Sequence, residues 1–461
     1  MDMIPLELVE QILHHASSCL NPSDLSSTLR SFCLVSHTWD QIAQPLLFSK
    51  FIRYGRSYDQ VKLHQTLLSY PHLRDLVECI WVDIGISSSS HWVTSNTTDS
   101  NLDSESTLDL YRQLTRNPRF HHIVIKNVNP SEAKPRAQEI LSSLISSANV
   151  TVLSCYRLSR YPIDLFYHCI SVRELHLYQS RFSGFERIGV GSLEGVQEGV
   201  ARRLDENGTH QDLSSSRRRR RPTLLYLYLE ALQGDEDILK WFLHPNCAFD
   251  ISELKTLDFY DDSCESDSFQ RVQEIVARTS SSLEEVGLHP PVYLSEVLIN
   301  VDYTTLASLP QLKCLKISLS GDENFWPWAI QLLSSLSHPE HIEELQVSYT
   351  LGPSGSEPLL SDVQAQGWEG LDLCLTAFAP SSAACPTTHR KFLNLKRVVI
   401  GLAICEWTTD GKSRSRRLAE AFPVILPRIS ALIPIKVSFS NVSGFIHNSD
   451  CWYIEGIHHS N

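Results

Sequence analysis

The sequence predicts an α/β fold in which a short three-helix N-terminal module is followed by an irregular array of strand-and-helix repeats. Two observations carry this prediction. Apolar residues recur at helical spacing over the first 50 residues, and an apolar-x-x-apolar-x-apolar pattern recurs along most of the remainder. The chain of 461 residues is long enough to bury a large core. We expect a helical domain over 1–50 and a repeat domain over 51–461.

The first predicted helix runs from about Pro5 to His15. Pro5 suits a first helical turn because its φ is fixed and no needed amide hydrogen is lost there. Glu7 and Glu10 complement the positive end of the helix dipole. The apolar residues that follow helical spacing are Leu8, Val9, Ile12, Leu13 and Ala16.

Two further helices are predicted before residue 50. The segment 21–24 is a turn-and-cap cluster, after which the apolar residues of a second helix are Leu25, Leu29, Phe32 and Cys33. Ser36 begins a third short helix, which we expect to end at Pro45 because a proline inside a helix removes a hydrogen bond. Three helices within about 45 residues cannot bury all of their apolar side chains. Either the rest of the chain or a partner protein must therefore cover the remaining ones.

The spacing of these residues resembles the F-box, whose pattern is Leu-Pro-x-Glu-Leu, then Ile-Leu, then a Leu-rich helix that ends in Val-Ser and a Trp. Two departures are visible: Ile4 replaces a leucine, and the connection from Ala16 to Pro22 is longer than the compact form. Taken singly, Pro5, Glu7 and Trp39 are a helix start, a first-turn charge and a core aromatic; together they favour the family. The pattern reads Ile4-Pro5-Leu6-Glu7-Leu8, Ile12-Leu13, Leu25, Leu29, Val35-Ser36 and Trp39.

The resemblance implies a substrate-recognition subunit of an SCF-type ubiquitin ligase. In that family the helices bind a Skp-type adaptor, which joins the cullin and RING subunits, and the second domain binds the target protein. The chain itself is then no enzyme, and it resides in the cytoplasm, the nucleus or both. The implied adaptor-binding residues are Ile4, Pro5, Leu8, Ile12, Leu13, Leu25, Leu29, Val35 and Trp39.

The second domain is predicted from nine copies of the apolar triplet. They are Val77, Ile80, Val82; Phe120, Ile123, Ile125; Val172, Leu175, Leu177; Leu224, Leu227, Leu229; Leu254, Leu257, Phe259; Leu283, Val286, Leu288; Leu312, Leu315, Ile317; Ile342, Leu345, Val347; and Leu395, Val398, Ile400. From Leu227 to Leu345 the middle positions are 30, 29, 29 and 30 residues apart. Such a period indicates one strand and one helix in each unit. The array resembles leucine-rich repeats, but the asparagine or cysteine that usually closes each turn is missing and the other steps are irregular, so we expect a distorted arc.

Helices are expected between the strands and polar loops at the irregular steps. The expected helices contain Phe269 to Val276, Trp328 to Leu336 and Trp368 to Phe378, and another begins at Leu418 and is limited by Pro423 and Pro427. A disordered insertion is expected around 190–221, which is rich in Gly, Glu, Ser and Arg. The insertion ends in the run Arg217 to Arg221. Three interpretations of this run stay open: a nuclear-import signal, a nucleic-acid contact and a solvated loop tip.

Polar residues beside the inward triplets are expected to face outward and to form rows across successive strands. Tyrosines among acidic groups suit a protein-binding face, which a basic partner segment would complement. The alternative is an ordinary polar sheet face. The candidate target-binding residues are His176, Tyr178, Tyr226, Tyr228, Asp258, Tyr260, Glu285 and His289.

Composition and spacing exclude several other classes of function. A net charge of -13 disfavours general nucleic-acid binding. The twelve cysteines include no Cys-x-x-Cys pair and no His-Glu-x-x-His motif occurs, so we expect no metal, and the glycines at 189, 191 and 195 have the wrong spacing for a dinucleotide cofactor. The scattered cysteines, the absence of a secretory signal and the prolines that break the apolar stretch Phe422 to Phe439 predict an intracellular chain without a membrane partner.

Two alternatives remain beside the ubiquitin-ligase hypothesis. The first is a protein-binding repeat scaffold without a ligase role, in which the N-terminal helices cap the first strand. The second is a hydrolase, which would need a deep pocket that gathers His176, Asp258 and a cysteine.

Overall fold

The computed structural model has an α/β fold of parallel strands and helices, which confirms the predicted class. It divides into two compact units. The first contains Met1–Gly55, Tyr226–Ala231 and Glu253–Asn461, and the second contains Arg56–Leu225 and Leu232–Ser252. The described residues are 6–19, 22–51, 65–83, 112–126, 135–185, 221–230, 235–260, 266–289, 306, 308–319, 325–351, 367–377, 391–404, 420–422 and 424–441.

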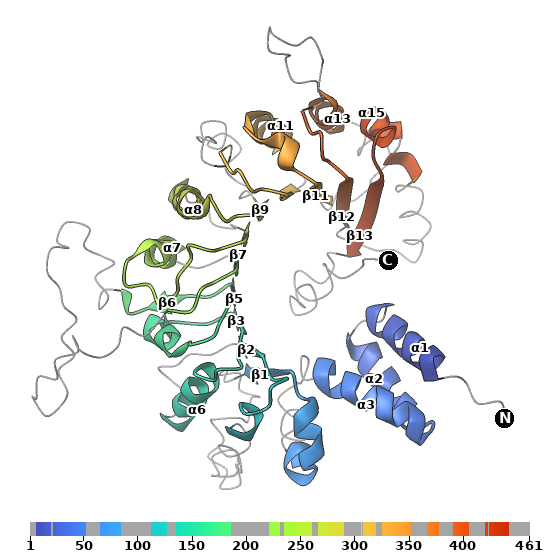
Figure 1. The fold of residues 1–461 in the computed structure, drawn as a ribbon, viewed down its shortest axis with the longest axis vertical. Coiled ribbons are helices and arrows are strands. Elements are labelled where there is room, and N and C mark those ends of the chain that lie inside the picture. The colour runs from blue at the N-terminus through green and yellow to red at the C-terminus, as the bar shows by residue number, and fades with distance from the viewer. Residues whose placement is uncertain are drawn as a thin grey trace, which may run out of the picture. The chain divides into compact units, whose positions relative to one another are not determined.

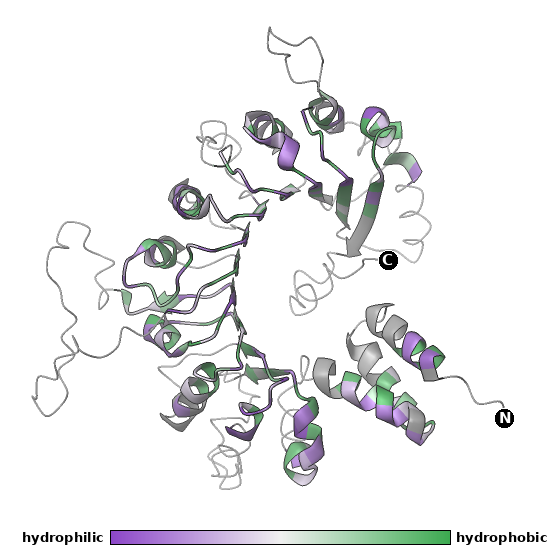
Figure 2. Cartoon of the chain, in the orientation of Figure 1, coloured by the Kyte–Doolittle hydropathy of each residue, from purple (hydrophilic) through white to green (hydrophobic). Residues whose placement is uncertain are grey.

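The N-terminal segment forms three helices, α1 (Leu6–Cys19), α2 (Pro22–Cys33) and α3 (His37–Phe51), as predicted (Figure 1). Hydrophobic and hydrophilic residues alternate around these helices (Figure 2), so each helix can turn an apolar stripe toward the others. Their core consists of Val9, Leu13, Leu29 and Ala43, and the partly buried side chains packed against it are Phe32, Cys33, Trp39, Ile42, Leu46 and Leu47.

The prediction that the third helix ends at Pro45 is wrong. The helix α3 continues through Pro45 to Phe51. A proline removes one intrahelical hydrogen bond, but Leu46 and Leu47 pack against the core of the three helices, and this packing offsets the loss. The predicted start at Pro5 lies outside the described residues, as do Ile4, the polar loop 87–106 and the segment 186–220, which holds most of the predicted insertion.

In the first unit, seven parallel strands follow one another in chain order. They are β7 (Tyr226–Glu230), β8 (Thr256–Tyr260), β9 (Glu285–His289), β10 (Cys314–Leu319), β11 (Glu344–Leu351), β12 (Arg397–Ile404) and β13 (Ile435–Asn441). The helices of this unit are α8 (Ser266–Thr279), α11 (Phe325–Ser335), η6 (Pro339–His341), α13 (Trp368–Thr376) and α15 (Pro427–Ser430). Figure 1 shows α8, α11 and α13 on the same side of the strands.

In the second unit, four more parallel strands are neighbours in chain order. They are β1 (Cys79–Asp83), β2 (His122–Lys126), β3 (Val152–Tyr156) and β5 (Glu174–Tyr178). The other elements are η1 (Pro71–Leu76), α6 (Pro135–Ile145), η3 (Ile163–His168), α7 (Asp235–Leu243) and the small sheet of β4 (Tyr161–Pro162) with β6 (Phe182–Ser183). Phe166 centres the aromatic core, with its ring 5.6 Å from Trp241, 5.8 Å from Phe249 and 5.6 Å from Phe182 between centroids.

All residues of the nine predicted triplets are buried. The second and third residues of each triplet lie on a strand, and the first lies just before it. Four of the described strands were not predicted: β3, β13 and the two-residue strands β4 and β6. The strand β3 carries the same spacing in Val150, Leu153 and Cys155, with a cysteine as its third apolar residue. No helix in the described ranges is long and apolar enough to cross a membrane.

Two asparagine side chains bind backbone carbonyls in the turns that precede strands of the second unit. The side-chain amide of Asn117 donates to the backbone carbonyls of Arg74 (2.9 Å) and Val77 (3.1 Å). Asn149 donates in the same way to Thr115 (2.9 Å) and Asn117 (3.2 Å). Three of these carbonyls already accept another bond, Arg74 from the Val77 N–H, Thr115 from the Ser147 hydroxyl and Asn117 from the Phe120 N–H. The two amides therefore add a second hydrogen bond and link the turns before β1, β2 and β3 to one another.

Replacing Asp372 by alanine is expected to lower the free energy of unfolding by about 1–2 kcal/mol. The buried carboxylate of Asp372, on α13, accepts the backbone N–H groups of Arg428 (3.2 Å) and Ile429 (2.8 Å), which open α15. Urea unfolding followed by circular dichroism measures the change. The control is Asp372→Asn, whose side-chain oxygen can still accept one of these bonds, and an alanine variant as stable as the wild type would contradict the capping role.

Candidate functional site

The N-terminal helices expose four apolar side chains, which we call the N-terminal apolar surface: Leu8, Ile12, Leu34 and Val35. On α1, Leu8 is 47% and Ile12 39% exposed, and their four-residue spacing places them on one face of the helix. Leu34 (88%) and Val35 (62%) follow the end of α2. Just beyond them, the Ser36 hydroxyl accepts the N–H of Trp39 (3.4 Å) and caps α3. The helices therefore pair a closed core with apolar residues that face solvent.

The other predicted adaptor-binding residues divide by burial. Leu13 and Leu29 are fully buried, so they hold the helices together and offer no surface to a partner. Trp39 is partly buried, with its ring 4.8 Å from that of Phe32 between centroids. Ile4, Pro5 and the side chain of Leu25 lie outside the described residues.

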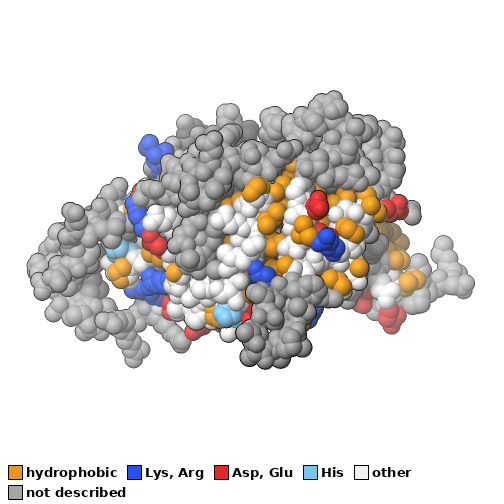
Figure 3. Space-filling model, turned by 90° about the horizontal axis from the view of Figure 1, so that it is seen from above, with side chains coloured by type: hydrophobic (Ala, Val, Ile, Leu, Met, Phe, Trp, Pro, Cys, Tyr) orange, Lys and Arg blue, Asp and Glu red, His pale blue; other side chains and the backbone are white. Residues whose placement is uncertain are grey.

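Exposed apolar residues also occur elsewhere on the chain. Leu373, Leu393 and Val424 are 42%, 60% and 72% exposed. Figure 3 likewise shows hydrophobic side chains (orange) among polar and charged ones on the face that it presents. Exposure alone therefore does not mark a binding site, and the N-terminal apolar surface is distinguished by its place on three short helices with a small core.

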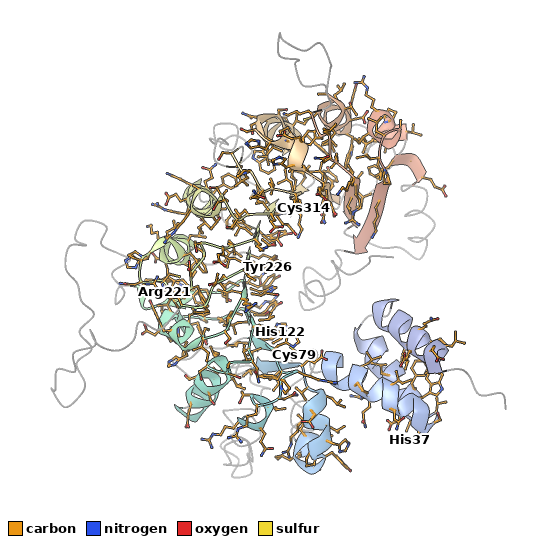
Figure 4. The ribbon with its side chains drawn as sticks, in the orientation of Figure 1. His37, Cys79, His122, Arg221, Tyr226 and Cys314 are labelled. Atoms are coloured by element: carbon orange, nitrogen blue, oxygen red, sulfur yellow. The ribbon has the colours of Figure 1, made fainter. Side chains whose placement is uncertain are left out.

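A second candidate lies on the sheet of the first unit, on the side away from α8 and α11. Figure 4 labels Tyr226 from β7 and Cys314 from β10, which point to this side. The strand register aligns Tyr228, Asp258, Gly287 and Lys316 in one row across β7 to β10. We call the surface the tyrosine–acidic face, and its members are Tyr226, Tyr228, Glu230, Asp258, Tyr260, Glu285, His289 and Lys316.

Asp258 is the centre of this face. Its side chain is buried, and Oδ2 accepts hydrogen bonds from the Tyr226 hydroxyl (2.8 Å) and from Lys316 Nζ (3.3 Å). Lys316 also pairs with Glu285. Burial lowers the pKa of Lys316, but the carboxylates of Asp258 and Glu285 outweigh it and hold that pKa above its ordinary value. Lys316 is therefore charged at neutral pH.

Gly287 makes the contact between Asp258 and Lys316 possible. It is the register partner of both residues, on the strand that lies between theirs. A Cβ at this position would lie 2.1 Å from Asp258 Oδ1, so any side chain would displace the carboxylate. No hydrogen-bond donor within the described ranges reaches Asp258 Oδ1.

An aromatic row crosses the same face. The ring of Tyr260 lies 5.3 Å from Tyr228 and stacks at 5.5 Å on His289, between centroids. The Tyr228 hydroxyl donates to Glu230. Burial, together with the charges of the neighbouring carboxylates, raises the pKa of Tyr260, and burial lowers the pKa of His289 to about 4. At neutral pH both rings are uncharged.

The predicted target-binding residues do not form one exposed surface. Tyr178, Tyr228 and Asp258 are buried, so they support the neighbouring side chains more than they offer contact area. Tyr226, Tyr260, Glu285 and His289 are partly exposed and belong to the tyrosine–acidic face. His176 and Tyr178 belong to the second unit, where burial lowers the pKa of His176 to about 4 and the Tyr178 ring lies 5.4 Å from that of Tyr156.

Little in the described residues resembles a catalytic centre. Figure 4 labels His122, whose Nε2 lies 2.9 Å from the Ser154 hydroxyl oxygen, but that serine is buried in the sheet. The hydrolase alternative, which required His176, Asp258 and a cysteine in one deep pocket, stays a prediction, because His176 belongs to the second unit and Asp258 to the first. The described ranges contain no group of three or more His, Cys, Asp or Glu side chains that could hold a metal ion.

Comparison with known proteins adds no assignment. No protein-family model matches the chain, and no curated protein matches it. Its function is therefore inferred from the N-terminal apolar surface and the tyrosine–acidic face.

Proposed function

We propose that the chain is the substrate-recognition subunit of an SCF-type ubiquitin ligase. Its N-terminal helices, an F-box-like module, bind a Skp-type adaptor that joins the cullin and RING subunits. The strands and helices that follow, an irregular leucine-rich-repeat-like solenoid, bind the target protein. One observation carries the proposal: Leu8, Ile12 and Val35, at positions of the F-box pattern, are exposed to solvent in the free chain.

The physical argument for a partner is the apolar area left in water. Burying a leucine or isoleucine side chain contributes about 1.5–3 kcal/mol, so covering the N-terminal apolar surface would supply a large part of a specific binding energy. A core as small as that of α1 to α3 is also marginal alone, and a partner that packs against the three helices would stabilise them.

The proposed role is proximity and involves no catalysis by the chain. Binding the adaptor at one surface and a target at another raises the effective concentration of a target lysine near the conjugating enzyme. The proposal places the protein in the cytoplasm, the nucleus or both.

Co-expression of the full chain with a Skp-type adaptor tests the proposal. We expect a stable complex that survives affinity purification and size-exclusion chromatography. Failure to form this complex would favour the alternative, a repeat scaffold without a ligase role. The tyrosine–acidic face supports that alternative equally, because nothing in its geometry depends on α1 to α3.

Replacing Tyr226, Tyr228 and Tyr260 together by alanine is expected to weaken target capture and to spare adaptor binding. The three substitutions remove one of the two donors to Asp258 and two rings of the aromatic row. Quantitative mass spectrometry of co-purifying proteins, normalised to the adaptor, measures the loss. The control is Tyr70→Ala, an exposed tyrosine of the second unit, and a protein profile unchanged by the triple substitution would remove the face from target recognition.

A further inference from the structure

We propose that the second unit binds an acidic segment of the target protein at two neighbouring turns that carry arginines. These turns, 157–160 after β3 and 179–181 after β5, are called the arginine turns. The inference rests on the proposed function, because it names the chemistry of the partner that the repeat domain would bind. Three features of the described residues support it: the bonds that join the two turns, the charge of their exposed arginines, and the backbone conformation of these residues.

Hydrogen bonds join the arginine turns to each other. The N–H of Arg157 donates to the carbonyl of Tyr178 (2.8 Å). The N–H of Arg181 donates to the carbonyl of Leu158 (2.7 Å). The buried hydroxyl of Ser180 accepts the N–H of Leu158 (3.2 Å) and donates to the carbonyl of Tyr178 (2.8 Å). These bonds fix the backbone of both turns, so the side chains on them start from defined positions.

Arg160 and Arg181 are neighbours on these turns. Each directly precedes a strand of the small sheet, β4 or β6, and the two strands pair in parallel with Tyr161 opposite Phe182. The carbonyl of Arg181 accepts the N–H of Tyr161 (3.0 Å), which continues the pairing toward the two arginines. Neighbouring strands lie about 4.8 Å apart, so two side chains as long as arginine can reach the same bound group.

The arginine turns present positive charge to solvent. Arg157, Arg160 and Arg181 are all exposed. Arg157 Nε donates to the side-chain oxygen of Gln179 (3.1 Å), which is uncharged. In the part of the chain that the structure describes, neither the Arg160 nor the Arg181 guanidinium has an ion-pair or hydrogen-bond partner. Two like charges at neighbouring positions repel each other, and an anion that bridges them would remove this repulsion.

The backbone conformation points the same way. Arg157, Arg160 and Gln179 have φ angles of 50°, 52° and 45°, in the left-handed region that glycine adopts most readily. The turns alone would therefore favour glycine at these positions. The local fold does not explain why two of the three residues are arginines, whereas a binding role for their side chains does.

An acidic protein segment fits these turns better than other anions do. A guanidinium binds a carboxylate through two parallel hydrogen bonds. The three arginines are spread over turns that follow two different strands, so an extended segment with carboxylates at intervals contacts more of them than one compact anion would. The net charge of -13 repels a long polyanion such as a nucleic acid more strongly than a short segment with a few carboxylates.

The test uses the purified full chain and two fluorescein-labelled peptides of Gly-Ser-X repeats, in which X is glutamate or glutamine. The peptides have the same length, and only the first is charged. Fluorescence anisotropy at about 0.05 M salt is expected to show the glutamate peptide binding at least about tenfold more tightly, although the chain as a whole repels it. Equal affinity for the two peptides would overturn the proposal, and so would tighter binding of a single-stranded oligonucleotide of the same charge.

Arginines at the two ends of the same strands provide matched variants. Arg160→Gln combined with Arg181→Gln is expected to weaken binding of the glutamate peptide about tenfold. The control, Arg119→Gln combined with Arg173→Gln, removes two exposed arginines that precede β2 and β5 in the same unit, and it is expected to leave the affinity unchanged. Equal losses from the two pairs would show that only the overall charge matters and would overturn the proposal.

A glycine variant separates binding from folding. Arg160→Gly removes one charge at a position whose φ suits glycine, so it is expected to weaken the glutamate peptide about threefold without lowering the Tm. Unchanged affinity in this variant would contradict the role of Arg160. Adaptor co-purification distinguishes the two proposals. An adaptor complex without preference for the glutamate peptide defeats only this inference, and selective peptide binding without an adaptor complex defeats only the proposed ligase role.

Discussion

Replacing Leu8 and Ile12 together by glutamate is expected to abolish co-purification with a Skp-type adaptor. Both side chains are exposed in the free chain, so the charges disturb the isolated helices little. In the proposed complex both would be buried, and an unpaired charge buried in an apolar interface costs several kcal/mol, which corresponds to a loss of about a thousandfold or more in affinity. Co-expression pull-down followed by isothermal titration calorimetry measures the effect.

The control for this experiment uses the same kind of substitution elsewhere. Leu373→Glu combined with Val424→Glu also places two glutamates at exposed apolar positions, on α13 and just before α15, and should leave adaptor binding intact. Circular dichroism checks that the helices of both variants persist. An adaptor complex that survives Leu8→Glu with Ile12→Glu would contradict the assignment of α1 as a docking helix.

Most of the strands could be predicted because the inward triplets recur at a nearly constant interval. Among the strands that were missed, β3 and β13 show where pattern recognition fails. The strand β3 has the right spacing, but Cys155 takes the place of an aliphatic residue. The strand β13 follows Pro434 and contains Lys436, which interrupt its apolar pattern, although Val437 shares the register of Ile400. The predicted end of the third helix at Pro45 failed for another reason: the packing of the residues after Pro45 overrides the local preference of proline to end a helix.

The candidate face was only partly predictable. The two-residue period of a strand places Tyr226, Asp258 and Lys316 on one side of the sheet. It does not say that Lys316 reaches Asp258 across an intervening strand, because that contact depends on register, which the connecting loops and the hydrophobic pattern fix together. The signal that could have shown it is Gly287, the one outward position in its row without a side chain.

Replacing Lys316 by methionine is expected to lower the free energy of unfolding by about 3 kcal/mol, because it leaves Asp258 buried without its cation. The Lys316 side chain is 13% exposed and that of Asp258 only 4%, so solvent screens the pair weakly. Methionine keeps most of the aliphatic stem of lysine, and lost packing therefore contributes little. Urea unfolding followed by tryptophan fluorescence measures the change, since Trp326, Trp328 and Trp368 are buried in the same unit.

The pH dependence and a double-mutant cycle distinguish this charge effect from general damage. The folded-state pKa of Lys316 is raised above its ordinary value of 10.5, so the stabilisation by Lys316 is fully present below pH 10.5 and is lost as the pH rises through the folded-state value. The difference between wild type and Lys316→Met should therefore be constant from about pH 7 to 9 and should narrow only above this range. In the Asp258→Asn background, Lys316→Met should cost much less, because the buried charge is already gone. A cost equal in both backgrounds would show that the two side chains are not coupled, and the ion pair would then have no part in shaping the face.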